Sequence, residues 1–171
     1  MTPRILMVIA QRDFRDEEYL EPKKIFAEHD IKVVTASERK GECLGKLGAK
    51  VWAEVSLHEV NLHDYEAIVF VGGLGAKEFF ADDEALNLVR EANSEGKILA
   101  AICIAPSILA NAGILDGKKV TAFETEESHL NEKGAIFTGN PVEVDGQIIT
   151  ANGPEAAEEF GLAIVKVLDS R

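Results

Sequence analysis

The chain has 171 residues, 46% of them hydrophobic, a length that predicts one domain spanning residues 1–171. Its 30 acidic and 18 basic residues give a net charge of −12, which repels nucleic-acid phosphates and anionic membrane surfaces. We therefore expect neither nucleic acid nor a membrane as a partner. The apolar stretch from Ile5 to Ala10 is too short for a signal peptide or a membrane span, which predicts a cytoplasmic protein.

In the first two-thirds of the chain, apolar runs rich in β-branched residues alternate with segments of helical period. This alternation is typical of a parallel sheet with helices on both faces, and so of an α/β fold. Leu20 and Phe26 are expected on the buried face of the first helix, and Leu86 and Val89 on that of the second. In chain order, the expected elements are a strand over residues 4–10, a helix over 17–29, strands over 31–37 and 67–71, a helix over 83–94 and a strand over 98–103.

Three further segments complete the predicted fold. Residues 43–57 carry two glycines between short apolar runs, which indicates a β excursion. The dipeptide Asp145-Gly146 tolerates the positive φ angles of a two-residue turn and predicts a hairpin over residues 142–150. After Pro154, apolar residues recur at helical spacing, which predicts a closing helix over residues 155–168.

The strongest chemical signal is Cys103, where an apolar strand meets a helix start marked by Pro106. Ala101 and Ala105 flank it two positions away on either side, as a nucleophile elbow requires, because the tight turn leaves no room for bulk. We predict a reactive nucleophile whose pKa is lowered by the helix N-terminus. The alternative is a buried cysteine that acts as a small hydrophobe. Cys43 lacks this frame and is expected to be a structural or exposed thiol; with no C-x-x-C pair, neither a disulfide nor a metal site is expected.

A second signal is the paired glycines Gly72 and Gly73, which end a predicted strand. Their spacing, G-G-x-G, is neither the dinucleotide-binding fingerprint nor a phosphate loop, so we expect no cofactor. The Gly73 amide, with that of Ile104, would form an oxyanion hole beside Cys103. The alternative is a plain tight turn.

The acidic run Asp16-Glu17-Glu18 follows the first strand, at an edge where open α/β sheets bind ligands. Acids there also stabilise a helix N-terminus, so only spatial pairing with Cys103 would single one out. Nothing in the sequence places a histidine near Cys103. We retain His129 and an acid, Glu124 or Glu126, as candidates for a third group.

These segments together resemble the DJ-one/PfpI superfamily, which includes intracellular proteases, protein deglycases, glyoxalases, chaperones and isocyanide hydratases. The resemblance covers nearly the whole chain, through the E-x-x-x-P of Glu18 to Pro22, VGGLGA, AAIC-x-x-P, GKKVTA and DGQIITANGP. It implies a flavodoxin-like α/β/α sandwich with a mostly parallel sheet, and homodimers or larger homo-oligomers. It also implies that Cys103 is the reactive cysteine and that Glu18 is its partner, protonated and hydrogen-bonded to the sulfur.

The chain departs from this pattern at the histidine. Protease-like members carry one after the cysteine, where Ile104 stands, and the deglycase-like branch carries one where Phe123 stands. Amide hydrolysis needs a group that protonates the leaving nitrogen, which disfavours a peptidase. Our leading hypothesis is a glyoxalase- or deglycase-like enzyme in which Cys103 attacks a small electrophile, an α-oxoaldehyde, and Glu18 shuttles protons. The alternatives are an oxidative-stress sensor or chaperone with an oxidisable Cys103, and an intracellular cysteine peptidase.

Overall fold

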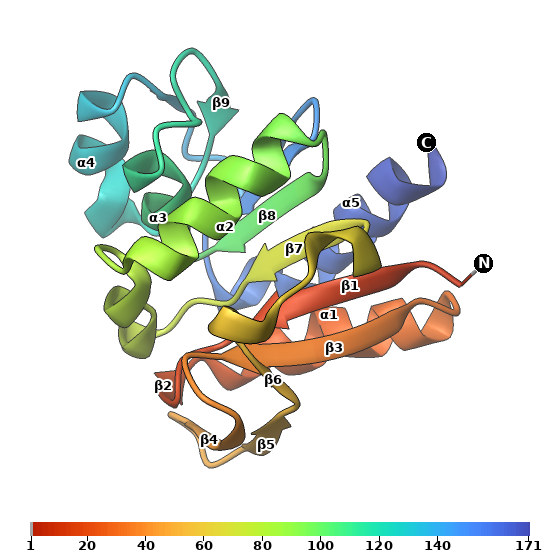
Figure 1. Ribbon diagram of the computed structural model, residues 1–171. Coiled ribbons are helices and arrows are strands. Elements are labelled where there is room, and N and C mark those ends of the chain that lie inside the picture. The colour runs from red at the N-terminus through yellow and green to blue at the C-terminus, as the bar shows by residue number, and fades with distance from the viewer. Residues whose placement is uncertain (1) are drawn as a thin grey trace.

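The computed structural model describes residues 2–171 and has a seven-stranded central sheet (Figure 1). The strand order is β11-β12-β8-β7-β1-β3-β6, and every neighbouring pair is parallel except β11–β12. The strands are β1 (Arg4–Val8), β3 (Lys32–Ser37), β6 (Val55–Ser56), β7 (Ala67–Phe70), β8 (Ile98–Ile102), β11 (Val142–Asp145) and β12 (Ile148–Ala151). The four predicted strands are confirmed, with ends that differ by one or two residues.

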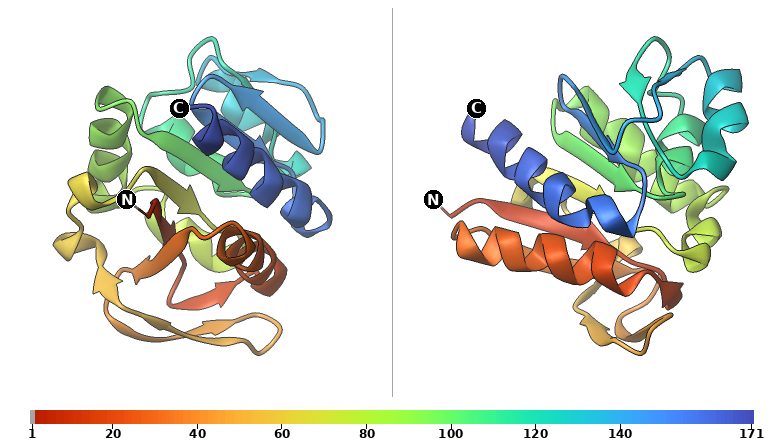
Figure 2. Two further views of the ribbon diagram at one scale, coloured as in Figure 1. Left: turned by 90° about the vertical axis from the view of Figure 1, so that its right-hand side faces the viewer. Right: turned by 180° about the vertical axis from the view of Figure 1, so that it is seen from behind.

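Helices cover both faces of this sheet, which gives the expected three-layer α/β/α sandwich. Helices α1 and α5 pack together on one face, and α2 and α3 lie on the other (Figures 1 and 2). The strands β7 and β8 are buried along their whole length because both faces are covered, which explains their continuous apolar sequences. The helices are α1 (Asp16–Glu28), α2 (Asp83–Ser94), α3 (Pro106–Asn111), α4 (Glu127–Glu132) and α5 (Ala157–Asp169).

The apolar face of α1 differs from the prediction at one position. Phe26 is fully buried, but Leu20 is 47% exposed. The buried stripe runs through Tyr19, Pro22 and Phe26, at spacings of three and four residues, and Leu20 lies about 100° from it around the helix axis. In α2, Leu86 and Val89 are buried as predicted.

The β excursion over residues 43–57 is confirmed as part of a second, three-stranded sheet in the order β2-β4-β5. This small sheet lies beyond the end of β1 (Figure 1). Its strands are β2 (Arg12–Phe14), β4 (Gly41–Gly45) and β5 (Lys50–Ala53). A third sheet has two parallel strands, β9 (Lys119–Val120) and β10 (Ile136–Phe137). Short 3-10 turns are η1 (Leu57–Glu59), η2 (Leu62–Asp64), η3 (Leu74–Phe79), η4 (Glu124–Glu126) and η5 (Pro154–Ala156).

The predicted hairpin forms between β11 and β12, with its turn one residue later than expected. Asp145 pairs with Ile148, so the two turn residues are Gly146 and Gln147. Gly146 has a φ of 62°, a conformation that favours glycine. The turn therefore uses the glycine of the Asp-Gly dipeptide, whereas Asp145 is the last residue of the strand.

The parallel strands β1, β7 and β8 all end at the same edge of the sheet, where chain segments from three parts of the sequence meet. This edge carries Gly72 after β7 and Cys103 after β8. Between residues 2 and 171, no helix is long and apolar enough to cross a membrane. The same residues contain no cluster of three or more His, Cys, Asp or Glu side chains arranged to hold a metal ion.

Candidate functional site

Cys103 lies on a strained turn directly after β8. Its φ of 65° is in the left-handed region, which side chains other than glycine rarely adopt. Two backbone hydrogen bonds hold it there: the Cys103 amide donates to the Ala151 carbonyl (2.9 Å), and the Phe123 amide donates to the Cys103 carbonyl (2.8 Å). Ala101 and Ala105 are fully buried on either side. The backbone thus has the strand-to-helix geometry of a nucleophile elbow.

Glu18 reaches this turn from the first turn of α1 and is fully buried. Its Oε1 accepts a hydrogen bond from the Gly72 amide at 3.0 Å. Its Oε2 is buried without a hydrogen-bond partner among residues 2–171. Burial is the largest influence on this carboxyl and raises its pKa to about 8, while contacts with Cys103 and Gly72 oppose the shift. Glu18 therefore holds its proton for the larger part of the time at neutral pH.

The thiol of Cys103 departs from the prediction of a lowered pKa. Burial raises its pKa most, and the negative charge of the Glu18 carboxylate raises it further. The amides of Gly73 and Ile104 lower it. The expected effect of the helix N-terminus is not dominant, because α3 has only six residues and begins three residues after Cys103.

Glu18 and Cys103 titrate as one unit. While Glu18 keeps its proton, it is uncharged and does not repel a thiolate on Cys103. The carboxyl proton can then form a hydrogen bond to the sulfur. The pKa of Glu18 is raised to about 8 and that of Cys103 to about 12, so the first proton lost by the pair leaves the charge mainly on the Glu18 carboxylate. The amides of Gly73 and Ile104 lower the pKa of the Cys103 thiol and so favour a thiolate.

Gly72 and Gly73 have different roles at the site. A Cβ on Gly72 would come within 2.6 Å of the Cys103 Cβ and would collide with the Glu18 carboxyl, so only glycine lets these two side chains approach. The Gly72 amide binds Glu18 and is not free for an oxyanion. Gly73 has a φ of 97°, and its amide, like that of Ile104, acts on the sulfur.

The three consecutive acids have three different partners. Asp16 is buried, and its carboxylate accepts hydrogen bonds from the amides of Leu47 (2.9 Å) and Ala49 (2.8 Å). Glu17 forms an ion pair with Arg15 at 2.8 Å. Of the three, Glu18 lies against Cys103. The acidic pattern left this choice open, and the family resemblance implied it.

A cavity of about 520 Å³ opens over Cys103. Its apolar wall includes Leu74, Ile104, Phe123 and Pro154. Its polar and charged side chains are Arg15, Lys46, Lys77, Thr125 and Glu126.

Two of the three candidates for a third group lie elsewhere. His129 is on α4, with its Nε2 at 2.6 Å from Asn111 Oδ1, and is not part of the cavity wall. Glu124 lines a neighbouring cavity that shares Phe123 and Pro154 with this one. The third candidate, Glu126, lines the cavity over Cys103.

The model of the DJ-1/PfpI family matches residues 3–167 of the chain. The chain belongs to the DJ-1/PfpI family. A crystal structure of a ThiJ/PfpI domain protein from Brachyspira murdochii is 37% identical, superposes with a TM-score of 0.97, and is covered over 98% of its length by 99% of this chain.

Two curated relatives of this DJ-1/PfpI protein are archaeal. An uncharacterized protein of Methanocaldococcus jannaschii is 45% identical over 97% of this chain and 82% of its own length. The deglycase PfpI of Pyrococcus furiosus is 29% identical over 95% of this chain and 98% of its own length. The homodimer or larger homo-oligomer that the family resemblance implies stays a prediction.

Both positions at which the family resemblance predicts a histidine line the cavity, and they hold the hydrocarbon side chains Ile104 and Phe123. In the part of the chain that the structure describes, the cavity wall contains no histidine. The sequence did not single out Arg15, Lys46 or Lys77. No local pattern marks them, because they come from three separate segments that only the fold brings together.

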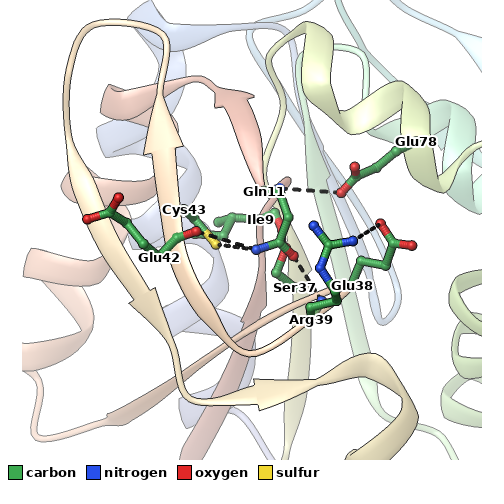
Figure 3. Close-up of polar contacts among 8 residues, drawn as sticks. All are labelled: Ile9, Gln11, Ser37, Glu38, Arg39, Glu42, Cys43 and Glu78. Carbon is green, nitrogen blue, oxygen red and sulfur yellow. Dashed lines mark hydrogen bonds and ion pairs between the residues drawn. The ribbon is translucent and has the colours of Figure 1, made fainter.

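The second thiol, Cys43, has different surroundings (Figure 3). It lies on β4 and is fully buried, and Gln11 Nε2 is 3.5 Å from its sulfur. The Gln11 side chain also accepts a hydrogen bond from the Arg39 amide (2.8 Å), and so links neighbouring chain segments. Burial raises the pKa of the Cys43 thiol. Cys43 is thus a structural thiol, one of the two outcomes expected.

Proposed function

We propose that this protein is an enzyme acting on a small reactive electrophile, an α-oxoaldehyde, with Cys103 as nucleophile and Glu18 as the group that carries protons. The observation that carries the proposal is the buried Glu18 carboxyl, held through one oxygen by the Gly72 amide and with its other oxygen unpartnered in the described chain. The relative named as a deglycase supports a reaction of this class.

In the first step, the Cys103 sulfur attacks the aldehyde carbon, and a C–S bond forms as the C=O double bond becomes a single bond. The thiol proton is replaced by the bond to carbon, and the aldehyde oxygen gains a proton from Glu18. The amides of Gly73 and Ile104 stabilise the negative charge on oxygen before it is protonated. The product is a hemithioacetal, Glu18 is left as a carboxylate, and the proton released by the thiol passes to solvent.

In the second step, the Glu18 carboxylate removes the hydrogen on the former aldehyde carbon as a proton and returns it to the adjacent ketone carbon, through an enediol. The proton of the hemithioacetal hydroxyl passes to the ketone oxygen, which leaves a thioester carbonyl. One carbon is oxidised and its neighbour is reduced, so no external oxidant is required. Water then hydrolyses the thioester to a 2-hydroxy acid and the free thiol. A single carboxyl with a pKa near neutrality is suited to both giving and taking protons in this sequence.

The test is consumption of methylglyoxal, with lactate measured as the product. We expect turnover to disappear in Cys103→Ser and in Glu18→Gln. Glu124→Gln, which removes an exposed acid outside the cavity over Cys103, serves as the matched control and should retain activity. Wild-type turnover that persists in both Cys103→Ser and Glu18→Gln would overturn the proposal.

A second candidate is a redox sensor in which peroxide oxidises Cys103 to a sulfinate that Glu18 stabilises by a hydrogen bond. The half-buried position of Cys103 beside a protonated carboxyl favours this reading. A mass gain of two oxygens mapped to Cys103 after mild peroxide, in a protein that turns over no aldehyde, would support it.

The remaining alternative, a peptidase, requires Glu18 to make every proton transfer, including the one to the leaving nitrogen. A fluorogenic peptide cleaved by rigorously purified wild type and not by Cys103→Ser would support that activity.

A further inference from the structure

The charge of the cavity over Cys103 is opposite to that of the chain. The whole chain has 30 acidic and 18 basic residues. Among the side chains that line this cavity, three are basic, namely Arg15, Lys46 and Lys77, and one, Glu126, is acidic. In a protein with a net charge of −12, a cavity with this excess of cations is a local reversal that favours anions at short range.

The charges of the two lysines are not neutralised within the chain. Neither Lys46 nor Lys77 has an ion-pair partner among residues 2–171. The single acid of the wall is occupied otherwise, because Glu126 accepts hydrogen bonds from the hydroxyls of Ser107 (2.7 Å) and Thr125 (2.8 Å). Glu126 is therefore not paired with either lysine.

The backbone segments that carry the cations are fixed by hydrogen bonds close to Glu18 and Cys103. Lys46 donates its amide to the Phe14 carbonyl at 3.0 Å. The turn that follows Lys46 is fixed by the buried Asp16 carboxylate, through its hydrogen bonds to the amides of Leu47 and Ala49. This gives Asp16 a role: it keeps the turn that carries Lys46 at the cavity.

The other two cations, Arg15 and Lys77, belong to segments that adjoin the turn at Gly72 and Gly73. The Arg15 amide donates to the Gly72 carbonyl at 2.9 Å. Lys77 is in η3, which begins directly after Gly73. The hydrogen bond from Arg15 to Glu17 raises the pKa of Arg15 most, and the charges of Glu18 and Cys103, when ionised, raise it further. The Arg15 guanidinium thus acts electrostatically on Glu18 and Cys103 although Glu17 binds its Nε.

We propose that the cavity selects electrophiles that carry an anionic group, a carboxylate or a phosphate, with Lys46 and Lys77 as the specificity-determining residues and Arg15 in support. The carbonyl of such a molecule would meet Cys103 while its anionic end meets the cations. For turnover, this inference rests on the proposed function, but for binding and for reaction at Cys103 it stands independently.

The decisive experiment uses two alkylating agents of nearly the same size, of which iodoacetate is anionic and iodoacetamide is neutral. The second-order rate constant for modification of Cys103 is measured with each, and their ratio is compared with the ratio for free cysteine in the same buffer. We expect the iodoacetate-to-iodoacetamide ratio at low ionic strength to exceed that of free cysteine by roughly fivefold. Added salt should reduce the excess because it screens the lysine charges.

The test variant is the double substitution Lys46→Gln/Lys77→Gln. It should abolish most of the excess. The comparison uses the ratio because both reagents react with the same thiolate, so a change in thiolate fraction cancels. The matched control, Lys133→Gln/Lys166→Gln, makes the same change in net charge away from this cavity and should retain the excess. An equal ratio in wild type and Lys46→Gln/Lys77→Gln, or an equal loss in the control, would overturn the proposal.

Turnover provides a second arm that separates this inference from the proposed function. The two substrates are methylglyoxal, which is neutral, and an α-oxoaldehyde that carries a phosphate ester. We expect Lys46→Gln/Lys77→Gln to raise KM for the phosphate-bearing aldehyde roughly fivefold more than it raises KM for methylglyoxal. Anion selectivity in alkylation without any aldehyde turnover would refute the proposed function alone. Methylglyoxal turnover without anion selectivity would refute this inference alone.

Discussion

Cys43 and Cys103 have the same side chain in two different surroundings, and the difference shows which features separate a candidate nucleophile from a structural thiol. Cys43 continues a strand of the small sheet, is fully buried, and has no carboxyl hydrogen-bonded to it among the described residues (Figure 3). Cys103 lies at a left-handed turn, borders a cavity of about 520 Å³, and lies beside the buried carboxyl of Glu18. Backbone geometry, access and a partner carboxyl distinguish the two.

The largest expected difference between the two thiols is their rate of modification. Cys103 should react with iodoacetamide more than about a thousandfold faster than Cys43 in the folded protein, because Cys43 has no exposed surface and reacts only after local opening. The measurement is peptide mapping by mass spectrometry over a time course. In denaturant the two rates should converge to within about twofold. Comparable modification rates for Cys43 and Cys103 in the native protein would contradict this prediction.

The second prediction concerns the pH dependence that Glu18 adds to stability. Burial raises its pKa from 4.5 to about 8, so between these values the folded state binds more protons than the unfolded state. Stability due to Glu18 is therefore fully present below about pH 4.5 and falls as the pH rises to about 8, by on the order of 4 kcal/mol in all.

Glu18→Gln removes this titration and resembles the protonated acid in shape. Urea unfolding of both proteins at about pH 5, 7 and 9 should show wild type losing stability relative to Glu18→Gln as the pH rises. Parallel stability curves for the two proteins would mean that Glu18 is ionised at neutral pH and that its role as a proton donor is wrong.

The third prediction uses the glycine between the side chains of Glu18 and Cys103. Gly72→Ala places a Cβ 2.6 Å from the Cys103 Cβ and against the Glu18 carboxyl, so the pair must move apart. We expect methylglyoxal turnover to fall more than about tenfold and the free energy of unfolding to fall by about 2 kcal/mol. The control is Gly153→Ala, where an added Cβ meets nothing within 4 Å and φ is extended. Unchanged turnover in Gly72→Ala would show that the close approach is not required.

Much of the fold could be predicted because its determinants are local. The continuous apolar sequences of β7 and β8 identify strands covered on both faces, and the small residues around Cys103 identify the tight turn. Leu20 is the exception: its chemistry predicted burial, but the interior face of α1 is set by where the sheet lies.

The site could be predicted only in part, because its remaining properties depend on long-range geometry. Asp16, Glu17 and Glu18 are adjacent in sequence, yet successive residues of a helix point about 100° apart, so one acid reaches the glycine turn and another reaches the turn before β5. The cations Lys46 and Lys77 belong to segments with no shared motif. The raised pKa of Glu18 depends on its burial, which no local pattern encodes.

The smallest expected effect is that of removing the structural thiol. Cys43→Ala deletes a buried sulfur whose contacts are a weak hydrogen bond from Gln11 at 3.5 Å and the packing of the small sheet. We expect the free energy of unfolding to fall by about 1 kcal/mol and methylglyoxal turnover to stay within about twofold of wild type. Urea unfolding and steady-state kinetics on one preparation measure both. If turnover in Cys43→Ala fell as far as in Cys103→Ser, the two thiols would act together, and the contrast drawn between their surroundings would be wrong.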